Sequence, residues 1–118
     1  MAFSNQIYTA WAGTDDQLYI VRQTDLAASY QGIDTQKATT RQGPALAVFN
    51  NQLYVAWTGT DQDSHLYMAS YDGNSFASPI ILTETSYQGP TLAVFNNQLY
   101  VAWTDTNSLV QVTMPKLF

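Results

Sequence analysis

One stretch of thirteen residues, LAVFNNQLYVAWT, occurs twice in this chain, at residues 46–58 and again at residues 92–104. A third and altered copy, FSNQIYTAWAG, begins at Phe3. The tryptophans in these copies, Trp11, Trp57 and Trp103, follow one another at a spacing of 46 residues. A fixed spacing of this size indicates a repeat architecture, in which each repeat is one supersecondary unit and the fold follows from how the units stack.

The complete central repeat, residues 43–88, predicts four β-strands. Its runs PALAVF, QLYVAWT, HLYMASY and SPIILTE are short, rich in aromatic and β-branched residues, and bounded by turn-forming residues. Four short strands in about 40 to 45 residues are what one blade of a β-propeller requires. We therefore expect an all-β chain, a β-propeller built from four-stranded blades, with a partial blade at 1–42, a complete blade at 43–88 and a partial blade at 89–118.

The pattern within the strands favours stacked blades. The run LYVAW is apolar at every position, so both faces of that strand are expected to be buried. A blade between two neighbours provides this, whereas a sheet with one solvated face would alternate apolar and polar residues. Helices are disfavoured, because no window repeats apolar residues at i, i+3, i+4 and i+7 over three turns and Gly and Pro interrupt every repeat.

The number of strands predicts an assembly of more than one chain. The repeats supply about two and a half to three blades, roughly ten or eleven strands, whereas a propeller needs at least about four blades. An open arc would expose sheet edges and apolar faces. We expect a closed homo-oligomer, most simply a dimer; the ring would have six blades if each chain gives three, or five if strands are shared between the two chains, and both remain open.

Charge and composition limit the partners of this 118-residue chain. The net charge is −5 with four Lys and Arg in total, so we expect no nucleic acid and no anionic membrane surface as partner. Charged residues are only 11% of the chain, which leaves Asn, Gln, Ser and Thr to form a surface suited to neutral ligands. No apolar run approaches eighteen residues, so we expect no membrane insertion.

The cysteine and histidine content limits the possible chemistry, and the first ten residues bear on the location of the protein. The chain has no cysteine and a single histidine, His65, so we predict no disulfide, no metal and no cofactor. The opening MAFSNQIYTA has neither a basic region nor a long apolar core. We therefore expect no secretory signal peptide, and a protein that is cytoplasmic or released by a non-classical route.

The repeat pattern GPALAVFNNQLYVAWTGTD followed by LYMASYDGNSF resembles the blades of bacterial and invertebrate β-propeller lectins and, more loosely, the propeller repeats of sialidases. The resemblance covers nearly the whole chain. Within it, SYDGNSF is similar to the Asp-box turn of sialidase-like blades but lacks the residue usually found between Asp and Gly, so we interpret it as a turn with a structural role. The resemblance implies a propeller and, among the several functions of such repeats, a lectin.

Ligand sites are expected where two kinds of loop share one face of a blade. The loops after the second strand (GTD) and after the fourth (YQGP) leave on the same side and together offer a carboxylate, an amide and a ring or guanidinium. A pyranose packs its C–H face on an aromatic ring and pairs its hydroxyls with Asp, Asn or Gln. The predicted ligand-binding residues are Asp61, Tyr87 and Gln88 in one pocket, Asp15, Arg41 and Gln42 in a related pocket, and also Trp57 and Asp105.

Each of these residues also has a structural interpretation. Trp57 would fill the space between blades, because large aromatic side chains dominate protein cores. The aspartates would serve their own turns, and QGP would form the bend into the next strand.

Three functions are compared. A multivalent lectin that binds neutral glycans in repeated grooves is the expected function, because weak single sites gain avidity when multiplied. The alternative is a non-catalytic propeller for protein interaction or for targeting a toxin or adhesion system. A sialidase-like glycosidase requires an arginine cluster and a carboxylate pair or a Tyr nucleophile. This chain has only Arg22 and Arg41, at different positions of the repeat, and one glutamate, Glu84, so we expect no enzymatic activity.

Overall fold

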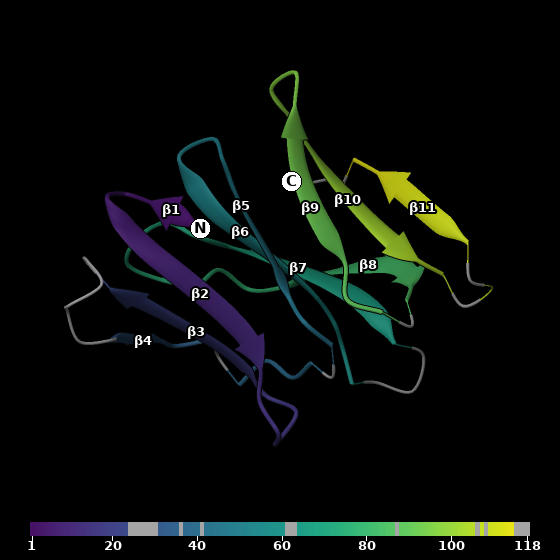
Figure 1. The fold of residues 1–118 in the computed structure, drawn as a ribbon, viewed down its shortest axis with the longest axis horizontal. Coiled ribbons are helices and arrows are strands. Elements are labelled where there is room, and N and C mark those ends of the chain that lie inside the picture. Colours follow the sequence, from purple (N-terminus) through teal and green to yellow (C-terminus); the bar gives the residue numbers. More distant parts are fainter. Residues whose placement is uncertain are drawn as a thin grey trace.

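In the computed structural model of this protein, the described residues are 1–23, 31–35, 37–40, 42–60, 64–86, 88–105, 107 and 109–114. Over these ranges the chain forms eleven β-strands and no helix. The strands make three antiparallel sheets, which lie side by side across the molecule without closing into a ring (Figure 1). The all-β class predicted from the repeat is therefore confirmed. No helix in these ranges is long and apolar enough to cross a membrane.

Each sheet is an up-and-down meander that takes its strands from one repeat. The N-terminal sheet comprises β1 (Ala2–Phe3), β2 (Gln6–Ala12), β3 (Leu18–Gln23) and β4 (Gln31–Ile33). The central sheet comprises β5 (Ala45–Phe49), β6 (Gln52–Thr58), β7 (His65–Tyr71) and β8 (Ile80–Thr85). The C-terminal sheet comprises β9 (Thr91–Phe95), β10 (Gln98–Thr104) and β11 (Val110–Thr113). The four strands predicted for the central repeat are confirmed to within two residues.

Asparagine pairs set the first hairpin of the central and C-terminal sheets. Asn50 and Asn51 have φ values of 51° and 59°, and Asn96 and Asn97 have the same two values. Two successive residues with positive φ are the mark of a type I′ turn, whose twist matches that of the strands it joins. The loop has only two residues, so Phe49 pairs with Gln52 and the alternation of faces along β6 is fixed.

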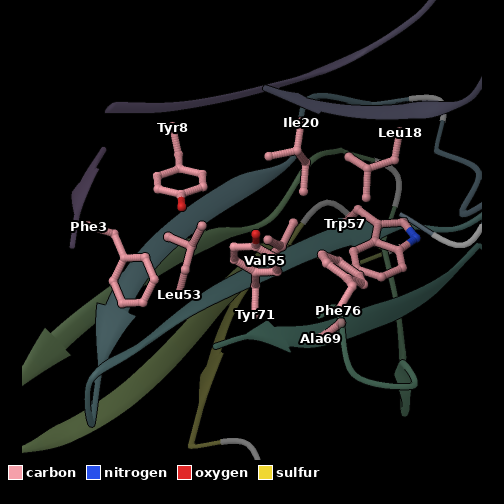
Figure 2. Close-up of a cluster of buried hydrophobic side chains, with 10 residues drawn as sticks. All are labelled: Phe3, Tyr8, Leu18, Ile20, Leu53, Val55, Trp57, Ala69, Tyr71 and Phe76. Atoms are coloured by element: carbon pink, nitrogen blue, oxygen red, sulfur yellow. The ribbon is translucent and has the colours of Figure 1, made fainter. Parts of the chain in front are cut away.

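The core lies between the sheets and forms two clusters. Along β6, Leu53, Val55 and Trp57 point toward the N-terminal sheet, where Tyr8, Leu18 and Ile20 meet them (Figure 2). The alternate residues Tyr54 and Ala56 point the other way, into a second cluster with residues of β7 and with Leu99, Val101 and Trp103 of the C-terminal sheet. Both faces of β6 are therefore buried, as its apolar run predicts.

Short polar segments connect successive sheets. Thr40 and Ser86 are fully buried at equivalent positions of the repeat, and each donates a hydrogen bond to the carbonyl oxygen two residues on, that of Gln42 or Gln88. Ser86 Oγ also lies 3.1 Å from the carbonyl oxygen of Thr104 in the next sheet. The two buried hydroxyls are thus satisfied by backbone carbonyls at the point where one sheet ends and the next begins.

Each outer sheet has one face on which no described strand packs. On the N-terminal sheet this face presents Trp11, which is 42% exposed, together with Ile7. On the C-terminal sheet it presents Phe95, Val110 and Val112, each more than half exposed. These residues alternate along their strands with residues that face the core, so the two exposed faces are properties of whole sheets.

Candidate ligand-binding groove

A stacked pair of aromatic rings marks the first two repeats. Trp57 on β6 lies opposite Tyr67 on β7 in the strand register, and their ring centroids are 5.8 Å apart with an interplanar angle of 10°. In the N-terminal sheet Trp11 lies opposite Tyr19, with centroids 5.6 Å apart and an angle of 17°. Residues directly opposite one another on antiparallel strands share a face, so the register itself creates each stack.

A glycine makes room for each tyrosine. A β-carbon at Gly59 would overlap the ring of Tyr67, and a β-carbon at Gly13 would lie 2.5 Å from Cε2 of Tyr19. The glycine of the GTD loop therefore serves close packing of the tyrosine ring against the loop backbone.

The C-terminal sheet replaces this glycine and tyrosine together. Asp105 stands at the glycine position, and Gln111 lies opposite Trp103, where the other repeats have tyrosine. Gln111 Nε2 donates a hydrogen bond of 2.9 Å to Asp105 Oδ2. The third repeat thus has a polar pair and no aromatic stack at this position.

A groove of about 310 Å³ opens above the Trp57–Tyr67 stack, between the N-terminal and central sheets. Trp57 is only 2% exposed and forms its floor, and Tyr67 is half-buried. The described lining residues are Lys37, Ala38 and Thr39 from the segment after β4, and Trp57, Gly59, Thr60, Tyr67 and Pro79 from the central repeat. The walls therefore come from successive repeats.

The groove combines an aromatic floor with a polar rim. The hydroxyls of Thr39 and Thr60 lie 2.8 Å apart across the boundary between the sheets, and either can be the donor. Both are hydroxyl groups that donate and accept, and Lys37 adds a donor with a positive charge. These groups suit a ligand with an apolar face and several hydroxyl groups.

Asp15 lies beside the stack of the N-terminal sheet. Its carboxylate accepts a hydrogen bond of 2.6 Å from the hydroxyl of Tyr19 and one of 3.1 Å from the backbone N–H of Gln17. The Tyr19 bond, and then the Gln17 bond, lower the pKa of Asp15, and the same contact raises the pKa of Tyr19. Asp15 thus braces its own loop, while the exposed Trp11 beside it has no sheet in front of it.

Asp105 also holds a turn. Its carboxylate accepts hydrogen bonds from the backbone N–H groups of Asn107 at 2.8 Å and Leu109 at 3.0 Å. The Leu109 bond is the main cause that lowers the pKa of Asp105. In the turn between β7 and β8, Asp72 likewise accepts from the N–H groups of Asn74 and Ser75, as expected for a structural turn.

The residues predicted as ligand contacts fall into three groups. Asp61, Arg41 and Tyr87 lie outside the described residues. Gln42 and Gln88 lie in the segments that connect the sheets, where their carbonyl oxygens accept hydrogen bonds from buried hydroxyls. Asp15 and Asp105 lie in the loops between the second and third strands of the first and third repeats, and Trp57 lies in the stack of the second repeat, where it lines the groove.

Two tyrosines of the stacks, Tyr19 and Tyr67, were not among the residues predicted from the sequence. Tyr19 and Tyr67 each follow a leucine in a recurring LY pair that opens the third strand of the repeat. If the Trp-ending and LY-starting strands form a hairpin, the register sets Trp against Tyr, so the recurring pair was a usable signal. Lys37, Thr39 and Thr60 carried no such signal, because only the packing of successive sheets brings them together.

A second hollow, of about 260 Å³, lies between the same two sheets. It is lined by Arg22, Asp34, Tyr71, Asn74 and Ser75 among others. The Arg22 guanidinium donates hydrogen bonds of 2.9 Å to the Tyr71 hydroxyl and 3.0 Å to Gln31 Oε1. Because these bonds engage the guanidinium with the protein itself, the groove above Trp57 is the better candidate.

No group of three or more His, Asp or Glu side chains that could hold a metal ion is found in the part of the chain that the structure describes. The sequence matches no protein-family model and no curated protein.

Proposed function

We propose that this protein is a carbohydrate-binding lectin, whose three sheets are blades of a β-propeller and which binds neutral glycans in grooves between neighbouring blades. The observation that carries the proposal is the groove above the Trp57–Tyr67 stack, with hydroxyls of Thr39 and Thr60 at its rim. The C–H face of a pyranose packs on an aromatic ring while its hydroxyls exchange hydrogen bonds with polar side chains.

The sheet arrangement supports the propeller part of the proposal. Each sheet is a meander of adjacent antiparallel strands, and each packs one face on the sheet before it and the other on the sheet after it where such a neighbour exists. Radial repetition of four-stranded sheets about an axis has this packing order. In a ring of this kind, every boundary between blades is a possible groove.

The groove supports binding rather than hydrolysis. Its described lining residues include no carboxylate, whereas a glycosidase uses two carboxylates or a Tyr nucleophile with an arginine cluster. We therefore propose a non-enzymatic lectin that needs neither cofactor nor metal.

A glycan array with the purified chain tests the lectin function, and substitutions at Tyr67 test the site. Tyr67→Phe keeps the flat ring and should retain binding within a few-fold. Tyr67→Leu keeps apolar bulk but loses the ring face, and should weaken binding of the best glycan of the array about 5-fold or more, since a stacking contact contributes about 1 kcal/mol or more. Binding is measured by titration calorimetry, with and without EDTA, which should have no effect.

The outcomes separate the alternatives. Glycan binding that is equal in Tyr67→Phe and Tyr67→Leu would place the site elsewhere, with the hollow beside Arg22 next to be tested. An empty array would refute the lectin function and leave a propeller for protein interaction or targeting as the better proposal.

A further inference from the structure

The contact between neighbouring sheets is directional and occurs twice in the chain. In the first contact, Leu18 and Ile20 of β3 share a buried cluster with Trp57 of the next sheet (Figure 2). In the second contact, Leu66 and Met68 of β7 share a cluster with Trp103 of the sheet after that. In both, two apolar residues on the third strand of one repeat cover the tryptophan of the following repeat.

The C-terminal sheet carries the same apolar pair, but no described tryptophan lies beneath it. Val110 and Val112 stand on β11 where Leu66 and Met68 stand on β7, because each pair lies opposite the same two positions of the preceding strand. The corresponding register pairs are Ala12↔Leu18 and Ala10↔Ile20, Thr58↔Leu66 and Ala56↔Met68, and Thr104↔Val110 and Ala102↔Val112. Val112 is 62% exposed, whereas Met68 is buried.

The rest of this exposed face also copies a buried one. Strands β9 and β10 share the sequence LAVFNNQLYVAWT with β5 and β6, so Phe95 corresponds to Phe49, which packs in the second cluster. Here Phe95 is 66% exposed, beside an apolar hollow of about 520 Å³. The hollow is lined by Thr91, Ala93, Phe95, Tyr100, Ala102 and Val112. A contiguous apolar face of this kind marks an interaction surface.

The surface that would fill the hollow lies on the opposite side of the same chain. The N-terminal sheet exposes Trp11 and Ile7, which correspond to Trp57 and Leu53 of the central sheet. Trp57 and Leu53 are buried because the preceding sheet covers them, whereas no described sheet packs on Trp11. The two exposed faces are thus the two halves of the contact that the chain already makes twice.

We propose that the exposed face of the C-terminal sheet packs on the exposed face of the N-terminal sheet of a second copy of this chain, with Val110 and Val112 of one copy covering Trp11 of the other. We choose a second copy as the partner because the two exposed faces are equivalent to the two faces that pack on each other inside the chain, where the third strand of one sheet covers the tryptophan of the next. A head-to-tail contact between two copies can be made at both ends, which joins six sheets in a closed pair.

This contact would also give the Trp11–Tyr19 stack a neighbouring sheet, as the Trp57–Tyr67 stack already has. In that respect the inference rests on the proposed function. A dimer would then hold two kinds of groove, one within each chain and one at each boundary between copies.

The mass of the protein in solution is the first test. Sedimentation velocity at micromolar concentration should give twice the chain mass of 13.1 kDa. Phe95→Lys and Ile7→Lys each bring an unpaired ammonium into one half of the contact and should weaken dimerisation about 100-fold or more. Asn74→Lys adds the same charge to an exposed turn of the central sheet and should leave the mass unchanged.

Mixing the two monomeric variants tests the direction of the contact. Phe95→Lys keeps an intact N-terminal face and Ile7→Lys keeps an intact C-terminal face, so an equimolar mixture should form a heterodimer through one good contact. Each variant alone should not. If either variant alone fails to fold, circular dichroism of the mixture should show recovery of β-structure.

Several results would overturn the proposal. A wild-type protein that sediments as a monomer excludes the proposed dimer. An Ile7→Lys variant that still dimerises by itself also excludes it, because that dimer would pair two C-terminal faces instead of a C-terminal face with an N-terminal face. Glycan binding is read separately: a dimer that binds no glycan keeps this inference and refutes the lectin. A monomeric Phe95→Lys variant that binds glycan through Tyr67 is the expected result, because the groove within the chain needs no second copy.

Discussion

The tryptophan of the repeat shows how neighbours decide the role of a residue. Trp57 is 2% exposed, Trp103 is 7% exposed and Trp11 is 42% exposed, although each lies near the end of the second strand of its sheet. The strand register and the local sequence are alike, so the difference comes from the sheet in front of each ring. Sequence analysis weighed Trp57 as core and as ligand contact, and in the structure it is a buried floor of the groove.

The aspartates of the loops are structural groups with a pH-dependent role. Hydrogen bonds from backbone N–H groups, that of Leu109 first, lower the pKa of Asp105 below its ordinary value of 3.8. A carboxylate with a lowered folded-state pKa stabilises the fold above its unfolded pKa, and this contribution is lost as the pH falls through the folded-state pKa. We therefore expect stability to fall in acid below about pH 4, in part through Asp105.

The Asp105→Asn substitution tests this expectation. An asparagine side-chain oxygen still accepts from the turn N–H groups but does not titrate at this pH. The variant should be less stable than the wild type at pH 7 and should lose less stability than the wild type on acidification, as followed by denaturant midpoints. A carboxyl ¹³C titration that places the Asp105 midpoint at or above its ordinary pKa would contradict the argument.

At the scale of strands and loops, the same hairpin of the repeat is packed in two ways, with Gly13 and Tyr19 in the first repeat and with Asp105 and Gln111 in the third. Trp11 and Tyr19 are as far apart in sequence as Trp103 and Gln111, so the loops of the first and third repeats have the same length. Glycine admits the tyrosine ring, and aspartate binds the glutamine amide. The residue at the glycine position and the residue at the tyrosine position are therefore expected to change together from one repeat to another.

A double-mutant cycle in the first repeat checks this coupling. Gly13→Asp alone should destabilise the protein, because its β-carbon meets the ring of Tyr19 and the nearby Asp15 carboxylate. Tyr19→Gln should reduce that cost, because it removes the ring and its amide N–H can donate to the new carboxylate, as Gln111 does to Asp105. We expect a coupling free energy of about 0.5 to 3 kcal/mol from urea unfolding curves. Additive effects would show that the exchange in the third repeat has no structural basis.

The strands were predictable from the sequence, and the groove was not. The spacing of Trp57 and Trp103, the Asn-Asn turns and the apolar runs located the strands of the central repeat, because these signals are local. The prediction grouped Asp61 with Tyr87 and Gln88, all from one repeat. The described groove instead joins Thr60 to Thr39 of the preceding repeat, and only the packing of two sheets determines such a pairing.

At the scale of the whole molecule, the two exposed faces and the groove combine into a prediction about valency. A closed pair of chains would carry at least the two grooves built on Trp57, one in each copy, and these are fixed relative to each other. Linking sites in this way raises avidity without a new contact, by about 100-fold or more where both sites engage one surface. The dimer should therefore agglutinate glycoprotein-coated beads at concentrations where a single site binds weakly.

The Phe95→Lys variant separates valency from recognition. As a monomer with an intact Trp57–Tyr67 stack, it should bind the free glycan with the affinity per groove of the wild type but should fail to agglutinate beads, because one groove cannot bridge two surfaces. Tyr67→Leu should keep the dimer mass but bind the free glycan more weakly in the groove above Trp57. Turbidity of the bead suspension, beside calorimetry with the free glycan, distinguishes the two. Agglutination by a Phe95→Lys variant shown to be monomeric would mean that the single chain is already multivalent, and would move a second working site onto the chain itself.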